Sequence, residues 1–122
     1  MYVAGRDHPH RAAAKEFLVK VRDGEIEGVT STEVLQEILY RYAALKRLDL
    51  ATGVYDLFLA LCSTILPVEL ADTDRAKSLL AKGIGVRDAI HAATMLNHSI
   101  THVATFDAAF DQIAGIKRID LV

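Results

Sequence analysis

The sequence predicts an α/β fold in which helices cover a parallel sheet. Along the 122 residues, stretches with a helical spacing of apolar side chains alternate with short apolar runs. This alternation is typical of strand–helix units that pack as layers around a parallel sheet. The composition, 52% hydrophobic and 25% charged residues, is that of an ordinary globular protein and argues against intrinsic disorder. We therefore expect one domain covering residues 1–122.

Five helices are predicted from apolar side chains that recur at intervals of three and four residues. Pro9 suits the first turn of the first helix, because proline lacks the N–H that a first turn leaves unpaired. The second helix follows a match to a capping box, in which Glu33 stands three residues after Thr30. The predicted helices cover residues 8–21, 31–42, 49–61, 72–80 and 87–98.

Short apolar runs predict the strands between these helices. Ile26 and Val29 mark the first run, and Pro67 indicates an edge position for the second run, residues 65–68. Residues 102–106 are predicted to form the clearest buried strand, and residues 116–122 alternate as a last strand would.

Charge and cysteine content exclude several classes of protein. The 14 basic and 16 acidic side chains give a formal net charge of −2, which excludes binding of nucleic acid by bulk charge alone. Cys62 is the single cysteine, which excludes an internal disulfide and fits a reducing cytoplasm. No apolar run approaches the ~20 residues of a membrane span, so we expect a cytoplasmic protein. Arg41, Lys46 and Arg47 could form a local basic face, although a solvated helix surface is the commoner meaning.

Three acidic residues are candidates for a ligand site at the carboxyl edge of the predicted parallel sheet. Asp107 follows directly after a predicted strand, and ligands of open parallel sheets bind beyond the carboxyl ends of the strands. Glu37 and Asp88 lie on helices that could begin at the same edge. Each acid also has a structural explanation: a helix N-terminus for Asp88, a turn for Asp107 and a solvated helix for Glu37. Spacing alone does not show whether the three meet.

A cluster of these acids would require a cation. Like charges ~4 Å apart repel by ~4 kcal/mol at an effective dielectric constant of ~20. Carboxylate oxygens suit hard ions such as Mg²⁺ or Mn²⁺, which can activate water for attack on a phosphodiester. His91, one turn after Asp88, could approach this pocket, although a helix histidine with a structural hydrogen bond is the commoner case.

Three segments resemble the PIN domain, and their order and spacing resemble the VapC toxins of type II toxin–antitoxin pairs. The segments are residues 30–39, 86–93 and 103–110, and the resemblance extends over essentially the whole chain. Each segment alone is a weak signal, whereas the three in this order are fairly specific. Glu37 matches the family's glutamate better than Glu33 does, because that glutamate follows the Val-Leu-Gln stretch.

The resemblance implies a Mg²⁺- or Mn²⁺-dependent endoribonuclease with a PIN-like three-layer α/β/α fold. RNA is then the substrate, a cognate antitoxin protein silences the enzyme, and a homodimer is suggested. By the same match, Glu37, Asp88 and Asp107 are the catalytic carboxylates that hold the metal. Thr105 matches the hydroxyl residue two places before the last aspartate, and Asp111 is a supporting acid at the surface or behind the ligands.

The amino-terminal segment departs from the family pattern. PIN domains open with a hydrophobic strand that supplies the first metal aspartate, and residues 1–9 contain nothing like it. Because that strand lies in the middle of PIN sheets, its absence would leave about four backbone groups unpaired, at a cost on the order of 4–12 kcal/mol. We expect the true start codon to lie upstream, with a differently closed sheet or a degraded remnant as alternatives. The chain as it stands is predicted to have a weakened metal site.

Two other functions stand beside the nuclease. A truncated PIN remnant could bind an antitoxin without cutting RNA, and divalent-ion binding would distinguish it from the enzyme. A receiver-like α/β domain would need a paired acidic cluster at a central strand and a later lysine, an arrangement that this sequence fits poorly.

Overall fold

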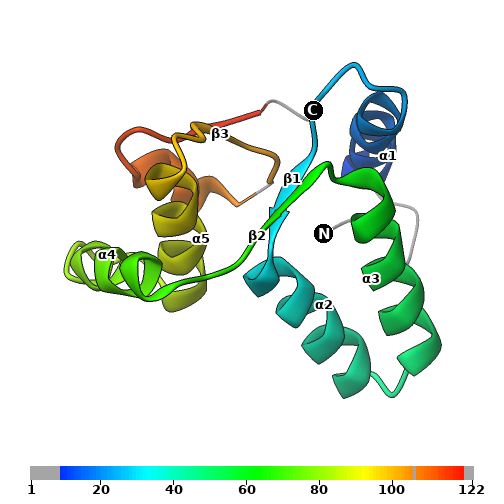
Figure 1. The fold of residues 1–122 in the computed structure, drawn as a ribbon, viewed down its shortest axis with the longest axis horizontal. Helices are drawn as coiled ribbons and strands as arrows, with labels where there is room; N and C mark the ends of the chain where they lie inside the picture. Colours follow the sequence, from blue (N-terminus) through cyan, green and yellow to red (C-terminus); the bar gives the residue numbers. More distant parts are fainter. Residues whose placement is uncertain (1–8, 106, 120–122) are drawn as a thin grey trace.

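The structure, a computed structural model, describes residues 9–105 and 107–119. The helices are α1 (Pro9–Arg22), α2 (Thr32–Ala44), α3 (Leu48–Leu61), α4 (Leu70–Leu80) and α5 (Val86–Asn97). The strands are β1 (Val29–Ser31), β2 (Thr64–Leu66), β3 (His102–Val103) and β4 (Lys117–Arg118), with the 3₁₀ helix η1 (Ala108–Gln112) before β4. Figure 1 shows α4 and α5 on one side of the molecule and α1, α2 and α3 on the other, with β1 and β2 between them.

The strands pair in parallel, which confirms the predicted α/β class. β1 pairs with β2 in the register Val29–Thr64, and β3 pairs with β4. Within the described residues these are two separate two-stranded ladders, whereas one continuous sheet was expected. The strand predicted over residues 102–106 is reduced to His102 and Val103, and the expectation of burial is wrong for His102, which is exposed. Among the described strands, β3 has a hydrogen-bonded neighbour on one edge only.

All five predicted helices are present, and each end lies within two residues of its predicted position. The predicted cap of α2 is wrong by one residue. Ser31 is the N-cap, and its Oγ accepts a hydrogen bond from the backbone N–H of Val34 at 3.4 Å. Thr30 lies buried in β1 instead. Because the helix begins at Thr32, Glu33 is its second residue and does not complete the capping box.

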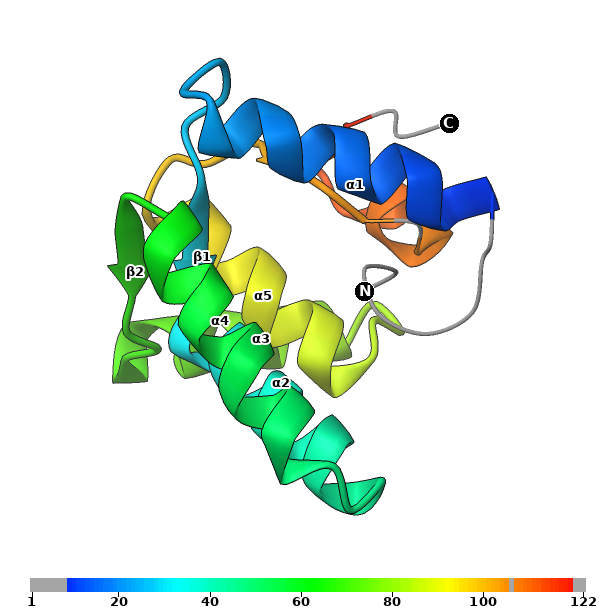
Figure 2. The ribbon, with the colours of Figure 1, turned by 90° about the vertical axis from the view of Figure 1, so that its right-hand side faces the viewer.

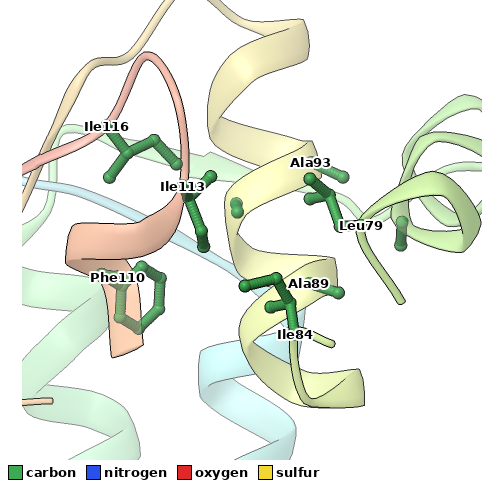
Figure 3. Close-up of a cluster of buried hydrophobic side chains, with 9 residues drawn as sticks. Leu79, Ile84, Ala89, Ala93, Phe110, Ile113 and Ile116 are labelled. Carbon is green, nitrogen blue, oxygen red and sulfur yellow. The ribbon is translucent and has the colours of Figure 1, made fainter. Parts of the chain in front are cut away.

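The first of two apolar cores surrounds α5, and we call it the α5 core. Three alanines of α5, spaced three and four residues apart, have no exposed surface and present one flat face. Figure 3 shows this face between α4 on one side and η1 on the other. The small side chains therefore let two elements pack closely against a single helix. The core consists of Ala76, Leu79, Ile84, Ala89, Ala92, Ala93, Phe110, Ile113 and Ile116.

The second core lies between α2 and α3, which lie side by side in Figure 1; in Figure 2, α3 lies in front of α2. We call it the α2–α3 core. It contains four buried residues, Leu35, Ile38, Tyr42 and Ala51. Partly buried side chains such as Phe58 and Ile65 complete it. The helix pair also exposes large apolar side chains, among them Leu39, Tyr40, Leu45, Leu48, Leu57 and Leu59.

A buried acid joins α4 to α5. Asp72 was predicted to begin the fourth helix, but it is the third residue of α4, and its Oδ2 accepts from the backbone N–H of Glu69 at 2.9 Å. Its Oδ1 accepts from Nδ2 of Asn97 at 2.7 Å, and Oδ1 of Asn97 accepts from Arg75 at 2.8 Å. Both oxygens of this 1%-exposed carboxyl are therefore paired, as a buried charge requires.

The prediction of an absent first strand falls on the segment before α1, and residues 1–8 lie outside the described part of the chain. Among the helices that are described, none combines the length and apolar character needed to cross a membrane.

Candidate active site

The candidate site lies where α2 meets α5. Nε2 of His91 donates to Oε1 of Glu37 at 3.0 Å, since an ionised carboxylate can only accept. The two side chains are 15% and 28% exposed, so the pair is shielded from bulk water on most sides. His91 therefore forms the structural hydrogen bond that is common for a histidine on a helix. Its partner, Glu37, is one of the predicted site acids.

The environment of Glu37 favours its charged form. The hydrogen bond from His91 lowers the pKa of this carboxyl, and the opposing effect of burial is smaller. The charges of His91, Arg87 and Arg41 lower the pKa further. Glu37 is thus a carboxylate fixed in position by one neighbour and flanked by positive charge from both helices.

Asp88 has the opposite environment. It lies in the first turn of α5, where the helix dipole favours an acid. Burial nevertheless raises its pKa, and the adjacent carboxyl of Asp107 raises it further, as a like charge and as a hydrogen-bond acceptor for the protonated form. The charge of Glu37 also raises this pKa. The three predicted acids therefore lie in one electrostatically coupled group.

Asp107 is the N-cap of η1. The structural explanation that the sequence offered for this residue, an aspartate in a turn, therefore also applies. Its Oδ1 accepts from the backbone N–H of Ala109 at 2.9 Å, and its own N–H donates to Oγ1 of Thr105 at 3.1 Å. Thr105 thus fixes the backbone of the loop that presents Asp107 to Asp88. Asp107 does not follow a strand directly, because β3 ends at Val103.

Asp111 is engaged elsewhere. Its carboxylate forms a two-pronged ion pair with the guanidinium of Arg118, with both N–O distances 2.8 Å. This pair lowers the pKa of Asp111. No interaction between Asp111 and the three acids is present among the described residues, so the structure gives it a role in joining η1 to β4.

Carboxylate chemistry at the Asp88–Asp107 pair fits a hard cation. Two adjacent acids repel each other, and neither has a lysine or arginine ion pair in the described part of the chain. Mg²⁺ commonly uses one or two carboxylates and keeps several waters, so two such ligands suffice. A complete protein cage is not formed: within residues 9–105 and 107–119, no three histidine, cysteine or acidic side chains are arranged to hold a metal.

Two further residues of this region were not singled out as site residues from the sequence. The guanidinium carbon of Arg87 lies 5.4 Å from the ring centroid of Tyr40, within range of a cation–π contact. Tyr40 is one turn beyond Glu37, and Arg87 immediately precedes Asp88. In the sequence, Tyr40 lies close to Glu37 and Arg87 lies next to Asp88. This closeness does not place Tyr40 beside Arg87 unless the packing of α2 against α5 is known.

Comparison with known families identifies the fold. The profile of the PIN domain matches residues 1–116. The chain belongs to the PIN-domain family. This PIN domain is 38% identical over 121 residues to the VapC ribonuclease Mb1869c of Mycobacterium bovis and to the ribonuclease VapC13 of Mycobacterium tuberculosis. Each alignment covers 98% of this chain and 92% of the relative. The ribonuclease VapC23 of M. tuberculosis is also 38% identical, over 88% of this chain and 86% of its own length. The predicted resemblance to VapC-like PIN proteins is confirmed.

Proposed function

We propose that this PIN domain is a divalent-metal-dependent endoribonuclease, the toxin of a type II toxin–antitoxin pair. The observation that carries the proposal is the 38% identity to VapC ribonucleases over 98% of the chain. The predicted acids Glu37, Asp88 and Asp107, which come from α2, α5 and the segment before η1, support it, because the charges of Glu37 and Asp107 both raise the pKa of Asp88. Its relatives are named ribonucleases, which supports RNA as the substrate.

Asp88 and Asp107 are the residues that would hold the ion. Their mutual repulsion is relieved by a bound cation, so the pair is poised to gain from binding one. Oxygen ligands favour Mg²⁺ or Mn²⁺ over softer metals. Such an ion, when bound, lowers the pKa of a coordinated water and offsets charge on the phosphate.

Glu37 has a different role in this scheme. Its lowered pKa keeps it ionised at neutral pH, so it can accept a hydrogen bond from a water molecule beside the phosphodiester. His91 holds Oε1, which leaves Oε2 to make that contact. Thr105 keeps Asp107 in place through the loop backbone.

The partners follow from the same proposal. As a VapC-type toxin, the chain would act on RNA in the cytoplasm, would be silenced by a cognate antitoxin protein and would form a homodimer.

A second candidate is a PIN domain that binds an antitoxin but does not cleave RNA. One observation favours it: no three-ligand metal cage exists among residues 9–105 and 107–119. The two candidates differ in whether the chain binds a divalent ion tightly enough to cleave RNA.

Calorimetric titration of Mn²⁺ and cleavage of a labelled RNA test the proposal together. Asp88→Asn should weaken Mn²⁺ binding at least tenfold and abolish metal-dependent cleavage, with circular dichroism unchanged. Asp56→Asn is the matched control, because Asp56 is an exposed acid on α3. Undiminished cleavage by Asp88→Asn would show that the site is assigned wrongly. Mn²⁺ binding and cleavage both absent from the unmodified chain would favour the second candidate.

A further inference from the structure

The α2–α5 interface continues beyond the acidic site. Glu37 contacts His91, and Tyr40, one turn later on α2, contacts Arg87, one turn earlier on α5. Successive turns thus pair in opposite directions, so the two helices run antiparallel where they meet. Side chains three and four residues apart share a helix face, which places Tyr40 and Arg41 each beside Glu37. The carboxylates therefore adjoin a strip of aromatic and basic side chains.

Tyr40 is an exposed aromatic residue in this strip. Its side chain is 65% exposed, although the neighbouring residues of α2, Ile38 and Tyr42, are buried in the α2–α3 core. The ring therefore adds little to the core. An exposed ring beside a guanidinium is a platform on which an unpaired base can stack.

The positive charges of the strip are available to an anion. Arg41 and Arg87 both act on the charge of Glu37, so both lie near the carboxylates. Neither forms an ion pair within 4.0 Å with another described residue. Arg47, which the sequence also suggested for a basic face, is held by Asp49 through two hydrogen bonds of 3.0 and 2.9 Å. Beside Glu37, the positive charges are therefore those of Arg41 on α2 and Arg87 on α5.

We propose that Tyr40, Arg41 and Arg87 form the surface that binds the single-stranded RNA substrate next to the acidic site. This inference rests on the proposed ribonuclease function and assigns the residues that hold its substrate. A base stacks on the Tyr40 ring, and the two guanidinium groups contact flanking phosphates. The arrangement resolves a difficulty of charge, because a chain of net charge −2 with an acidic site needs local cations to attract a polyanion.

Metal-free binding measurements separate this proposal from catalysis. A fluorescein-labelled, unstructured RNA of about twelve nucleotides is titrated with protein in EDTA, and anisotropy gives the Kd at several salt concentrations. Tyr40→Ala should weaken binding about 5- to 150-fold, the range for loss of one stacked base, and Tyr40→Phe should retain it. Arg87→Ala should weaken binding and reduce the slope of log K against log salt by about 0.7, the value for one phosphate contact.

Two controls match these variants. Lys20→Ala removes one positive charge from the last turn of α1, and Leu70→Ala truncates an exposed apolar side chain on α4. Neither should alter the Kd by more than about twofold. Thermal unfolding of every variant confirms that the fold is kept.

The outcomes distinguish the two proposals. Weaker binding by Tyr40→Ala and Arg87→Ala, with both controls unchanged, supports the surface even where the unmodified protein cleaves nothing, in which case only the proposed catalysis fails. Equal Kd values for Tyr40→Ala, Arg87→Ala and the unmodified protein overturn the surface while leaving the catalytic proposal to its own test.

Discussion

The α4–α5 half and the α2–α3 half of the molecule are both helix pairs, but they bury their apolar surface to different extents. In the α4–α5 half, alanines of α5 are covered completely, and the exposed large apolar residues Leu70, Leu80 and Val86 lie at helix ends. In the α2–α3 half, exposed leucines occur along both helices as well as at the turn. The first half is a completed core, whereas the second holds together with fewer buried side chains.

The difference bears on the site because each half supplies part of it. Glu37, Tyr40 and Arg41 belong to α2, whereas Asp88 and His91 belong to α5. A well-packed helix fixes the Asp88 side of the site, and the hydrogen bond from His91 joins it to the less buried side. The site is thus assembled between two units of unequal packing.

The largest expected loss of stability comes from truncating a large side chain in the better-packed α5 core. Phe110→Ala should reduce the free energy of unfolding by about 3–5 kcal/mol, because Phe110 is 4% exposed within the α5 core. Phe58→Ala, the matched truncation in the partly buried α2–α3 core, should cost about 2 kcal/mol. Urea denaturation of both variants measures the contrast. Equal losses would mean that the two halves are packed alike.

Removing the buried carboxyl that joins α4 to α5 should have the next largest effect. Asp72→Ala deletes the acceptor of both the Glu69 N–H and the Asn97 amide, at a cost of about 2 kcal/mol. Asp74→Ala, in the same helix but exposed, should change stability by less than about 0.5 kcal/mol. A fall in Tm confined to Asp72→Ala is the expected result, and similar Tm values would remove this link between the helices.

A smaller effect, the pH dependence of stability, should distinguish Asp88 in the α4–α5 half from Glu37 in the α2–α3 half. The pKa of Asp88 is raised, so its contribution to stability falls as pH rises above the ordinary value of 3.8. The pKa of Glu37 is lowered, so its contribution is present above 4.5 and is lost as pH falls through the folded-state value. In EDTA, Asp88→Asn should flatten the falling part of the stability profile, and Glu37→Gln the rising part. The same change of slope in both variants would contradict the opposite environments.

The smallest effect concerns the turn between α2 and α3. Lys46 has φ of 58°, a left-handed conformation that side chains disfavour. Lys46→Gly should therefore stabilise the protein by about 0.5–1 kcal/mol. Lys46→Ala is the control, because it removes the charge but keeps the Cβ atom. If both variants have the same Tm, backbone strain does not limit the stability of this turn.

The helices were predictable from the sequence because their information is local. Apolar side chains at intervals of three and four residues located all five helices within two residues. The exact cap of α2 was not predictable, since Thr30, Ser31 and Thr32 can all cap a helix and only the pairing of β1 with β2 decides among them. The division of the strands into two ladders was not predictable for a similar reason, because the neighbours of β3 are set by distant segments.

The candidate acids could be chosen from the sequence, but their surroundings could not be predicted. Glu37, Asp88 and Asp107 were chosen through the family pattern, and the charges of Glu37 and Asp107 both raise the pKa of Asp88. The contact of Glu37 with His91 joins residues 54 positions apart and leaves no local trace in the sequence. The same holds for Tyr40 and its partner on α5.

The hydrogen bond between α2 and α5 also has a consequence for the order of folding. α4 meets α5, and α2 meets α3, through short connections, so each pair closes at a small loss of chain entropy. Joining Glu37 to His91 closes a loop of 54 residues, so this contact costs more chain entropy than the contacts within each pair. The hydrogen bond is therefore expected to form after the contacts within the pairs. Any stress that separates the two pairs also separates Glu37 on α2 from Asp88 on α5.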